Sequence, residues 1–370
     1  MENRKWLLKA TPKGQISPSH FHLTREAVRQ ELGDGEVLLK NLVFSCDPAQ
    51  RTWLTASSYI PQVQPGEVMP AMSLAQVVKS RHPNFVEGEV VSGVGGWQEF
   101  FVFSSAELET AKAKAKDPSL SPWQRQQAKY RAGFLKLDKV SGVLPPGVPN
   151  EAALSLLGIT GLTAWTGLLK VGRMKTGDVV LVSGAAGSTG SFVGQLAKAK
   201  GAKKVIGIAG GKEKCESLKR EFGFDAALDY KAEREGGPSL LRQLKEAAPQ
   251  GVDVFFDNVG GDVLETGLFN IKKGARIVLC GAISQYDKKA TEMKGPRNLG
   301  ELIVKGASMQ GFIVMDFAPF FREAAVELAK LYAEGRIVVK HDIVEGFENL
   351  PNALCRLLAG KNVGKQLCRL

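Results

Sequence analysis

Residues Val179–Ser191 read Val-Val-Leu-Val-Ser-Gly-Ala-Ala-Gly-Ser-Thr-Gly-Ser. The first four are apolar and predict a short buried strand, which a glycine-rich turn follows at once. Beyond the turn, Val193, Leu196 and Ala197 recur at helical spacing. A strand, a glycine turn and the start of a helix together aim backbone N–H groups and the positive helix end at a phosphate. The stretch therefore predicts an anion-binding turn in an α/β domain.

Gly184, Gly187 and Gly190 lie three residues apart in this turn. The last two would let the main chain approach a pyrophosphate without an intervening Cβ atom. The spacing differs from the Gly-x-Gly-x-x-Gly of most dinucleotide sites, so it also fits a glycine turn in another kind of α/β enzyme. The next strand helps to distinguish these two interpretations.

That strand, residues 204–209, runs into Gly210 and a helix that begins near Lys212. An enzyme that uses NAD usually has Asp or Glu at the end of this strand, bound to the ribose 2′-hydroxyl. Here the position holds Ala209 and Gly210, and Lys212 and Lys214 follow. One charge-assisted hydrogen bond to a 2′-phosphate would favour NADP(H) about ten- to a hundredfold. We interpret Lys212 as a solvated helix residue and assign Lys214 to the phosphate.

The chain has 370 residues, which is long for one hydrophobic core and predicts two domains. Its formal net charge is +11, but the basic residues are scattered and form no nucleic-acid-binding motif. We interpret the charge as solubility and attraction of an anionic cofactor, with no nucleic-acid partner. The five cysteines are widely spaced and contain no Cys-x-x-Cys pair, which indicates free thiols in a reducing compartment. We therefore expect a cytoplasmic location.

Two stretches bear on a possible membrane contact. The N-terminus lacks an apolar core of the kind found in secretory signals. Residues 152–169 contain no charged side chain, but three glycines and three threonines interrupt them. Because this stretch is at the lower length limit for a membrane span, we interpret it as buried helical segments between the two domains. We expect no membrane partner.

The first 150 residues favour β structure. Short apolar runs separated by Gly and Pro predict strands at residues 5–9, 36–44, 77–80 and 88–93. Residues 106–133 instead predict two short helices, the second opened by Ser121-Pro-Trp-Gln124 as a capping box. We interpret this segment as a surface excursion. A lid over a substrate pocket, with Trp123 and Tyr130 as its aromatic face, is the alternative.

From residue 176 onward, strands and helices alternate. The pattern predicts strands at 179–183, 204–208, 225–228, 252–256, 276–280 and 308–314. It predicts helices at 190–200, 211–222, 238–248, 261–269 and 317–334. This alternation is typical of a doubly wound parallel sheet, whose ligands bind at the carboxyl ends of the strands. We expect such a nucleotide-binding domain at residues 151–334 and a mostly β substrate domain formed by residues 1–150 and 335–370.

Seven stretches, spread in order over nearly the whole chain, carry a resemblance to a known family. They are Gly161-Leu-Thr-Ala-Trp-Thr-Gly-Leu-Leu169, Ala185-Ala-Gly-Ser-Thr-Gly190, Gly207-Ile-Ala-Gly-Gly-Lys-Glu-Lys-Cys215, Phe256-Asp-Asn-Val-Gly-Gly261, Cys280-Gly-Ala-Ile-Ser-Gln-Tyr286, Glu345-Gly-Phe-Glu-Asn-Leu-Pro351 and Asn362-Val-Gly-Lys365. With them the chain resembles the zinc-independent medium-chain dehydrogenase/reductases, and in particular the prostaglandin reductase, alkenal double-bond reductase and curcumin reductase group. The resemblance implies an NADP-binding Rossmann domain, a smaller GroES-like domain and a homodimer.

The resemblance also implies which residues bind the cofactor. It assigns the pyrophosphate to Gly187, Ser188, Thr189 and Gly190. It assigns the 2′-phosphate to Lys214 and Tyr230, with Gly210 as a further contact. Other contacts, most of them around the ribose and nicotinamide, fall at Thr163, Asn258, Cys280, Gly281, Ile283, Ser284, Tyr286, Phe312, Ile313, Val314 and Asn362. Local sequence alone would make Asn258 an Asx turn, Asn362 a loop cap and residues 312–314 an edge strand, and these readings are compatible with cofactor contact.

Two features depart from the family pattern. The family often has Asp-Pro-Tyr-Met-Arg where this chain has Asp47-Pro-Ala-Gln-Arg51, so Ala49 replaces a phenol. The 106–133 segment is also longer than the resemblance would imply. Both departures concern the substrate rather than the cofactor.

Zinc-dependent relatives carry a Gly-His-Glu segment and a cysteine-rich lobe, and this sequence has neither. Its four histidines form no ligand set with the cysteines, so we expect no metal.

The predicted activity is the NADPH-dependent reduction of the C=C bond of α,β-unsaturated ketones or aldehydes, with hydride added to the β-carbon. Without a metal, hydrogen-bond donors have to stabilise the negative charge that develops on the carbonyl oxygen. Tyr286 and the nicotinamide ribose 2′-hydroxyl are the candidates, although Tyr286 also fits a packed loop tyrosine. Two alternatives stay open: an NADPH quinone oxidoreductase on the same scaffold, and a cofactor-binding structural or regulatory protein without turnover.

Overall fold

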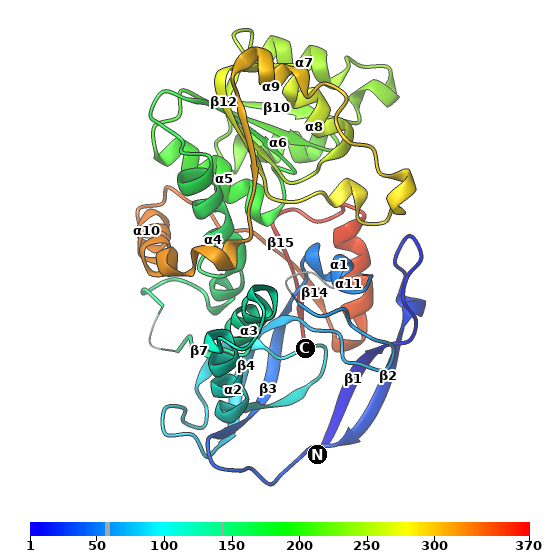
Figure 1. The fold of residues 1–370 in the computed structure, drawn as a ribbon, viewed down its shortest axis with the longest axis vertical. Helices are drawn as coiled ribbons and strands as arrows, with labels where there is room; N and C mark the ends of the chain where they lie inside the picture. The colour runs from blue at the N-terminus through cyan, green and yellow to red at the C-terminus, as the bar shows by residue number, and fades with distance from the viewer. Residues whose placement is uncertain (56–59, 142–143) are drawn as a thin grey trace. The chain divides into compact units, whose positions relative to one another are not determined.

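The computed structural model describes residues 1–55, 60–141 and 144–370, except for the side chain of residue 290 (Figure 1). The chain divides into two compact units. Unit 1 comprises Met1–Leu154, Asp342–Lys361 and Gln366–Leu370, and unit 2 comprises Ser155–His341 and Asn362–Lys365.

A parallel sheet forms the centre of unit 2. Over the described residues its order is β10-β9-β8-β11-β12-β13, with parallel pairing throughout. The bounds are β8 Val179–Ser183, β9 Lys204–Ala209, β10 Ala226–Asp229, β11 Val252–Asp257, β12 Ile271–Leu279 and β13 Ser308–Gly311. Because the order runs outward in both directions from β8 and β11, the sheet is doubly wound, and the predicted Rossmann fold is confirmed.

Helices cover both faces of this sheet. One face packs against α4 Ile159–Trp165, α5 Ser188–Ala199, α6 Lys212–Arg220 and α10 Phe321–Ala333. The other packs against α7 Leu240–Ala247, α8 Gly261–Leu268 and α9 Gly300–Lys305. Along β8, Val180 and Val182 belong to the first core, whereas Val179 and Leu181 belong to the second. Burial on both faces explains why this strand is apolar throughout.

The uncharged stretch 152–169 includes α4 and the π-helical segment Thr166–Val171 that follows it. Trp165 and Leu168 are 1% and 0% exposed, so these helical segments are buried, as predicted. Across the part of the chain that the structure describes, no helix is both long and apolar enough to cross a bilayer.

The last strand of the sheet is shorter than predicted. β13 ends at Gly311 rather than at residue 314, and Val314 opens a 3₁₀ segment that runs to Phe320 before α10 begins. Phe312 and Val314 pack against the core on the α4 and α10 face, and the Phe312 ring meets Phe317 edge-on at 6.1 Å. The chain leaves the sheet after Gly311, and both side chains lie in that core beyond the end of the strand.

Residues 335–341 and 362–365 belong to unit 2, although the predicted division placed them in the mostly β part. Ile337 is 1% exposed in the core of unit 2. The Gly364 N–H donates to the Ala186 carbonyl (2.7 Å), and Gly364 forms a parallel bridge with Gly187. These long-range contacts have no signature in the local sequence.

Unit 1 is mostly β, as predicted. β1 Glu2–Leu8 pairs with β2 Phe21–Ala27 in a small antiparallel sheet. In the larger sheet the order over the described residues is β14-β15-β3-β4-β5-β7, and β6 also pairs with β3. The bounds are β3 Glu36–Ser45, β4 Met72–Ser80, β5 Val90–Val94, β6 Phe100–Ser104, β7 Asp138–Lys139, β14 His341–Glu345 and β15 Lys365–Arg369.

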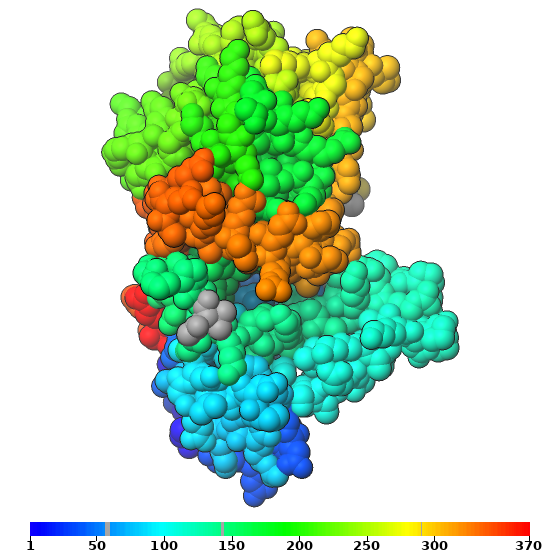
Figure 2. All heavy atoms as spheres, turned by 90° about the vertical axis from the view of Figure 1, so that its left-hand side faces the viewer, coloured from blue at the N-terminus to red at the C-terminus, as the bar shows by residue number. Residues whose placement is uncertain are grey.

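The helices of unit 1 are α1 Ala49–Trp53, α2 Ser105–Lys116, α3 Pro122–Phe134 and α11 Leu350–Leu358. α2 and α3 form a hairpin that stands out from the rest of the unit, in teal in Figure 2. The predicted capping box is confirmed, because Ser121 and Gln124 each bond the other's backbone N–H. Trp123 is 61% exposed whereas Tyr130 is 6% exposed, so the shared aromatic face of the alternative lid interpretation is not formed.

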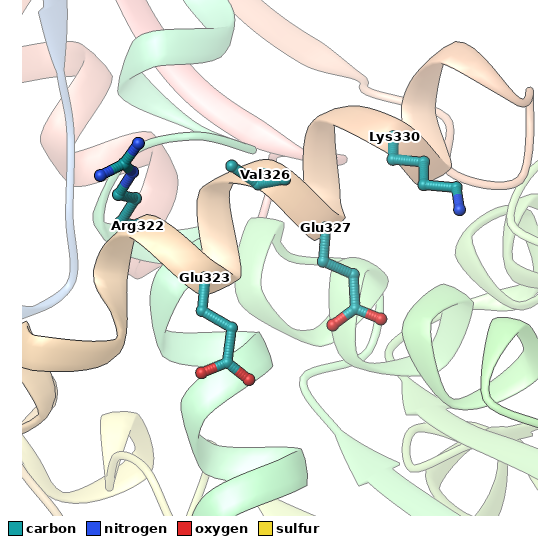
Figure 3. A pocket seen from close by; sticks show the side chains of 5 residues that line it. All are labelled: Arg322, Glu323, Val326, Glu327 and Lys330. Carbon is teal, nitrogen blue, oxygen red and sulfur yellow. The ribbon is translucent and has the colours of Figure 1, made fainter.

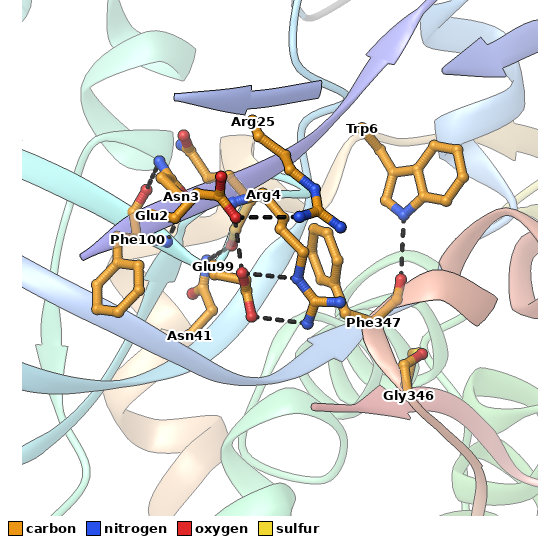
Figure 4. Close-up of polar contacts among 12 residues, drawn as sticks. Glu2, Asn3, Arg4, Trp6, Arg25, Asn41, Glu99, Phe100, Gly346 and Phe347 are labelled. Atoms are coloured by element: carbon orange, nitrogen blue, oxygen red, sulfur yellow. Dashed lines mark hydrogen bonds and ion pairs between the residues drawn. The ribbon is translucent and has the colours of Figure 1, made fainter. Parts of the chain in front are cut away.

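A partly buried polar network holds β1 in unit 1 (Figure 4). The Arg4 guanidinium donates to both oxygens of Glu99, through Nε and Nη2 at 2.8 Å each. The same guanidinium lies 5.0 Å from the centre of the Phe347 ring, and the Trp6 indole N–H donates to the Phe347 carbonyl (3.0 Å). The hydrogen bond from Arg4 holds the pKa of Glu99 below its usual value. Ionised Glu99 therefore stabilises the fold.

We expect Glu99→Gln to lower the free energy of unfolding by about 1 kcal/mol at neutral pH, because it removes a partly buried bidentate ion pair. A lowered carboxyl pKa contributes stability above its ordinary value of 4.5 and loses it as the pH falls through the lowered value. The difference between wild type and variant, measured by urea unfolding, should therefore vanish at acid pH. Glu2→Gln is the matched control, since Glu2 pairs with Arg25 at the surface. An equal effect of both variants, or a difference that persists once Glu99 is protonated at acid pH, would contradict this role.

Candidate functional site

The carboxyl ends of the parallel strands gather most of the predicted site residues at one edge of the unit 2 sheet. This edge includes the point between β8 and β11 where the strand order reverses, which is where doubly wound sheets bind ligands. The residues come from the turn after β8, the turns after β9 and β10, and the turns after β11 and β12.

The turn after β8 leaves the start of α5 open. The N-cap residue is Gly187, which has no side chain to cap the first-turn N–H groups, and this turn holds no acidic residue. A Cβ atom on Gly190 would lie 2.4 Å from the Gly184 carbonyl oxygen, so only glycine fits there. The Ser188 hydroxyl lies 2.8 Å from that of Thr160, and Thr189 is half-buried beside it in sequence. These features suit an anion at the helix N-terminus.

Residues 362–365 lie beside this turn through the Gly364 contacts with Ala186 and Gly187. Asn362 is 6% exposed, and its side-chain amide donates to the Gly364 carbonyl (2.9 Å). The Asn362 carbonyl in turn accepts a hydrogen bond from the Lys214 ammonium group (2.6 Å). The predicted pyrophosphate turn, Asn362 and Lys214 are thus joined by direct contacts.

The turn after β9 brings Gly210 against Tyr230. A Cβ atom on Gly210 would lie 2.7 Å from the Tyr230 ring, and the Tyr230 N–H donates to the Ala209 carbonyl (3.1 Å). Tyr230 is 42% exposed, so its phenol faces a surface that a ligand can reach. Lys214 lies on the first turn of α6, and Lys212, at its start, is exposed.

An acidic residue near this turn was not predicted as part of the site. Asp229, the last residue of β10, accepts the N–H groups of Gly211 and Lys231 through one carboxylate oxygen (2.8 Å each). It therefore links the residue after Tyr230 to the N-cap of α6 and places a negative charge at the start of α6. The signal was present in the sequence, because Asp229 directly follows a predicted strand.

The turns after β11 and β12 pack against each other. Asn258 donates its side-chain amide to the Ser183 carbonyl (2.7 Å). Ile283 and Ser284 donate backbone N–H groups to the Asn258 and Val259 carbonyls (3.4 and 3.1 Å). Predicted contacts at the ends of β11 and β12 therefore share one hydrogen-bonded assembly.

Cys280 and Gly281 donate their N–H groups to the Asp257 carbonyl (2.8 and 3.3 Å). Burial, with the Asp257 charge as a smaller cause, raises the pKa of the Cys280 thiol to about 12. The thiol is thus neutral at physiological pH, which argues against a nucleophilic role.

Tyr286 ends the second turn. Its hydroxyl oxygen accepts the N–H of Ala282 (3.1 Å), which leaves its O–H available as a donor. Burial raises the pKa of this phenol, the hydrogen bond from Ala282 partly opposes the rise, and the charge of Asp257 adds to it. Tyr286 is therefore a protonated, half-buried hydrogen-bond donor at neutral pH.

The remaining predicted contacts lie on the α4 side of unit 2. Thr163 donates its hydroxyl to the Ile159 carbonyl within α4 (2.6 Å). Phe312 lies against Gly167 of the π-helical segment, and Ile313 is 36% exposed. Val314 packs partly buried in the same core as Phe312. No hydrogen bond between these residues and the β8 turn is part of the described network, although α4 packs along α5.

Two surface cavities are lined by other residues. One, of about 550 Å³, runs along α10 and is lined by Arg322, Glu323, Val326, Glu327 and Lys330 (Figure 3). The other, of about 650 Å³, lies in unit 1, where Arg4 pairs with Glu99 and Arg369 with Glu151. None of the predicted site residues lines either cavity.

Ala49, which departs from the family pattern, and Arg51 both lie on α1 of unit 1. Arg51 is 2% exposed and donates to the Gly14 carbonyl (2.8 Å). Over residues 1–55, 60–141 and 144–370, no three His, Cys, Asp or Glu side chains are placed to share a metal ion. The zinc-independent reaction stays a prediction.

Two families match the chain. The "N-terminal domain of oxidoreductase" matches residues 4–111, and the "Zinc-binding dehydrogenase" family matches residues 188–331. Together they cover most of the β-rich first part of unit 1 and, except for β8, the sheet of unit 2.

Individual relatives match over almost the whole length. Prostaglandin reductase 1 of Bos taurus is 38% identical, over 99% of this chain and 98% of its own. The NADP⁺-dependent 2-alkenal reductase of Nicotiana tabacum is 34% identical, over 99% and 97%. The crystal structure of CurA from Vibrio vulnificus in complex with NADPH superposes with a TM-score of 0.84 at 34% identity, over 99% and 98%. The chain belongs to the medium-chain dehydrogenase/reductase family, in the group of the prostaglandin, alkenal and curcumin reductases that its sequence resembles.

Proposed function

We propose that this protein is an NADPH-dependent reductase of the C=C bond of α,β-unsaturated ketones and aldehydes. One observation carries the proposal: the edge of the unit 2 sheet combines an open helix N-terminus with a protonated tyrosine donor. The full-length similarity to an NADP⁺-dependent alkenal reductase and a prostaglandin reductase supports it.

The residues present fit NADPH. The uncapped start of α5, with the close approach at Gly190, suits a pyrophosphate. Lys214 and Tyr230 offer an ammonium group and a phenol where a 2′-phosphate would lie, and we assign them to it. For the remaining cofactor contacts we propose the residues that were predicted from the sequence.

When bound, NADPH supplies a hydride for the β-carbon of the substrate. We assign Tyr286 to the carbonyl oxygen, where negative charge develops as the enolate forms. Because Ala282 already donates to the phenol oxygen, the Tyr286 O–H is free to donate to that charge. The raised pKa keeps this proton on the phenol at neutral pH. Protonation at the α-carbon then completes the reduction.

A panel of enones, enals and quinones tests the activity. We expect NADPH oxidation, followed by absorbance, with enones and enals. Oxidation with quinones alone would instead identify a quinone reductase. NADPH binding, seen as tryptophan fluorescence quenching, without oxidation by any of these compounds would indicate a binding protein without turnover.

Tyr286→Phe removes the donor but keeps the ring. We expect kcat to fall about a hundredfold with little change in the NADPH dissociation constant, as for the loss of an oxyanion donor. Tyr332→Phe, on α10, is the control. Unchanged kcat in Tyr286→Phe would assign this residue to packing.

Lys214→Ala should raise the KM for NADPH about ten- to a hundredfold and leave that for NADH nearly unchanged, because only NADPH carries the phosphate. Lys212→Ala, at the exposed start of the same helix, removes one ammonium group as a matched control. Equal effects on both cofactors would mean that Lys214 acts through its bond to Asn362 rather than on the phosphate.

We also propose a homodimer. β13 lies at the end of the sheet order, and α9 before it exposes Ile303 (85%) and Val304 (77%). An unpaired edge strand beside apolar side chains suits pairing of two copies across a twofold axis. Light scattering should give twice the mass of the chain for wild type and a monomer for Ile303→Glu/Val304→Glu. A monomeric wild type, or a double variant that remains dimeric, would contradict this arrangement.

A further inference from the structure

Asp257, the last residue of β11, carries a carboxylate that is 0% exposed. The Ser183 hydroxyl donates to one of its oxygens (2.5 Å), and the Val259 N–H donates to the same oxygen (3.2 Å). The Gly260 N–H donates to the other oxygen (2.8 Å). The buried carboxylate therefore binds the backbone of the turn that follows it, at Val259 and Gly260.

Ser183 links this carboxylate to Asn258. The Ser183 hydroxyl donates a hydrogen bond to Asp257, and its oxygen accepts one from the Asn258 N–H (2.9 Å). The Ser183 carbonyl also accepts the Asn258 side-chain amide (2.7 Å). Asn258 is thereby held against the end of β8 in one orientation.

The backbone of this turn is in turn the support of the Cys280–Tyr286 turn. The carbonyl of Asp257 accepts the N–H groups of Cys280 and Gly281, as described above. The Val259 carbonyl accepts both the N–H and the hydroxyl of Ser284 (3.1 and 2.7 Å). The segment that leads to Tyr286 thus depends on where residues 257–259 place their carbonyl groups.

We propose that Asp257 is a positioning residue of this site: its buried carboxylate fixes the Asp257–Gly260 turn, and that turn holds the Cys280–Tyr286 turn so that the Tyr286 phenol is presented to substrate. The inference rests on the proposed function of Tyr286.

Electrostatics act in the same direction. Burial raises the pKa of Asp257, and the hydrogen bonds from Ser183, Gly260 and Val259 oppose that rise by favouring the ionised form. The charge of Asp257 contributes to the raised pKa of Tyr286. The carboxylate therefore helps to keep the phenol protonated as well as in place.

Asp257→Asn is the sharpest change available. It replaces one acceptor oxygen by an NH₂ group. Both carboxylate oxygens of Asp257 accept hydrogen bonds, so this NH₂ group faces a donor in either orientation of the amide. Asp253→Asn is the matched control on the same strand. Asp253 accepts the Val179 N–H (2.8 Å) and pairs with Lys272 (2.7 Å), and within the described part of the chain these contacts lie outside the two turns.

The first readout is hydrogen exchange of the ligand-free protein, followed by mass spectrometry. In Asp257→Asn, peptides that contain residues 280–284 should exchange about tenfold faster than in wild type, because their amide bonds to residues 257–259 open more often. Asp253→Asn should leave these peptides unchanged. Unchanged exchange in Asp257→Asn, or equal acceleration in both variants, would overturn the inference.

The second readout separates chemistry from binding. We expect Asp257→Asn to lower kcat about tenfold while the NADPH dissociation constant, from fluorescence quenching, stays within about twofold. A loss of NADPH affinity without a change in kcat would overturn the positioning role. If wild type reduces no enone, the proposed function fails, whereas hydrogen exchange still decides whether Asp257 holds the second turn.

Ser183→Ala provides a milder variant should Asp257→Asn not fold. It removes one hydrogen bond to the carboxylate and the acceptor of the Asn258 N–H. We expect exchange at residues 280–284 to accelerate in the same direction by a smaller factor, with Asp253→Asn again as the control. Exchange equal to wild type in Ser183→Ala would contradict the relay from Asp257.

Discussion

The start of α5 packs closely against the first residue of the turn that follows β8. A side chain at residue 190 would meet the Gly184 carbonyl oxygen at 2.4 Å, so this position has to be glycine. The approach brings the first-turn N–H groups of α5 to the edge of the sheet, where Gly187 leaves them uncapped. Residues 362–365 then complete this edge through Gly364, which bonds Ala186. The other parts of the site are arranged around this turn.

The charges at the β9 and β10 ends illustrate how a cofactor preference can coexist with an acidic residue. The Asp229 carboxylate accepts hydrogen bonds from the backbone N–H groups of Gly211 and Lys231, and it thereby fixes the backbone next to Tyr230. Lys214 has its ammonium group bonded to a carbonyl, that of Asn362. A carbonyl is a weaker partner than a phosphate dianion, so this lysine can serve both the apoprotein and the cofactor. The preference for NADPH that we propose therefore depends on the hydrogen bonds of the Asp229 carboxylate to the backbone as well as on the charge of Lys214.

The sequence predicted the sheet of unit 2 well because β8 and its neighbours are buried on both faces and end in glycine turns. It missed β2, whose only buried residue is Phe21, and α9, whose apolar residues Ile303 and Val304 face outward. Periodicity cannot find elements that lack a buried face. β13 was predicted too long because Phe312 and Val314 are apolar for a different reason, packing beneath α4 and α10.

The turn sequences and the family resemblance predicted the site residues. They did not predict the hydrogen bonds that join these residues. The bonds from residues 280–284 to residues 257–259, and from Gly364 to Ala186, join segments far apart in the chain. No local pattern encodes these bonds. Asp257 was therefore not predicted as a site residue, although it lies inside a motif that carries the resemblance. The physical role of a buried carboxylate becomes visible only when its donors are known.

In the proposed reaction, a hydride from the reduced nicotinamide reaches the β-carbon while Tyr286 stabilises the enolate oxygen. The most direct measurement is the reduction of a simple enone with NADPH deuterated at the transferred position, followed by NMR of the product. We expect deuterium at the β-carbon and a solvent proton at the α-carbon. Deuterium on the carbonyl carbon, with an allylic alcohol as product, would contradict it.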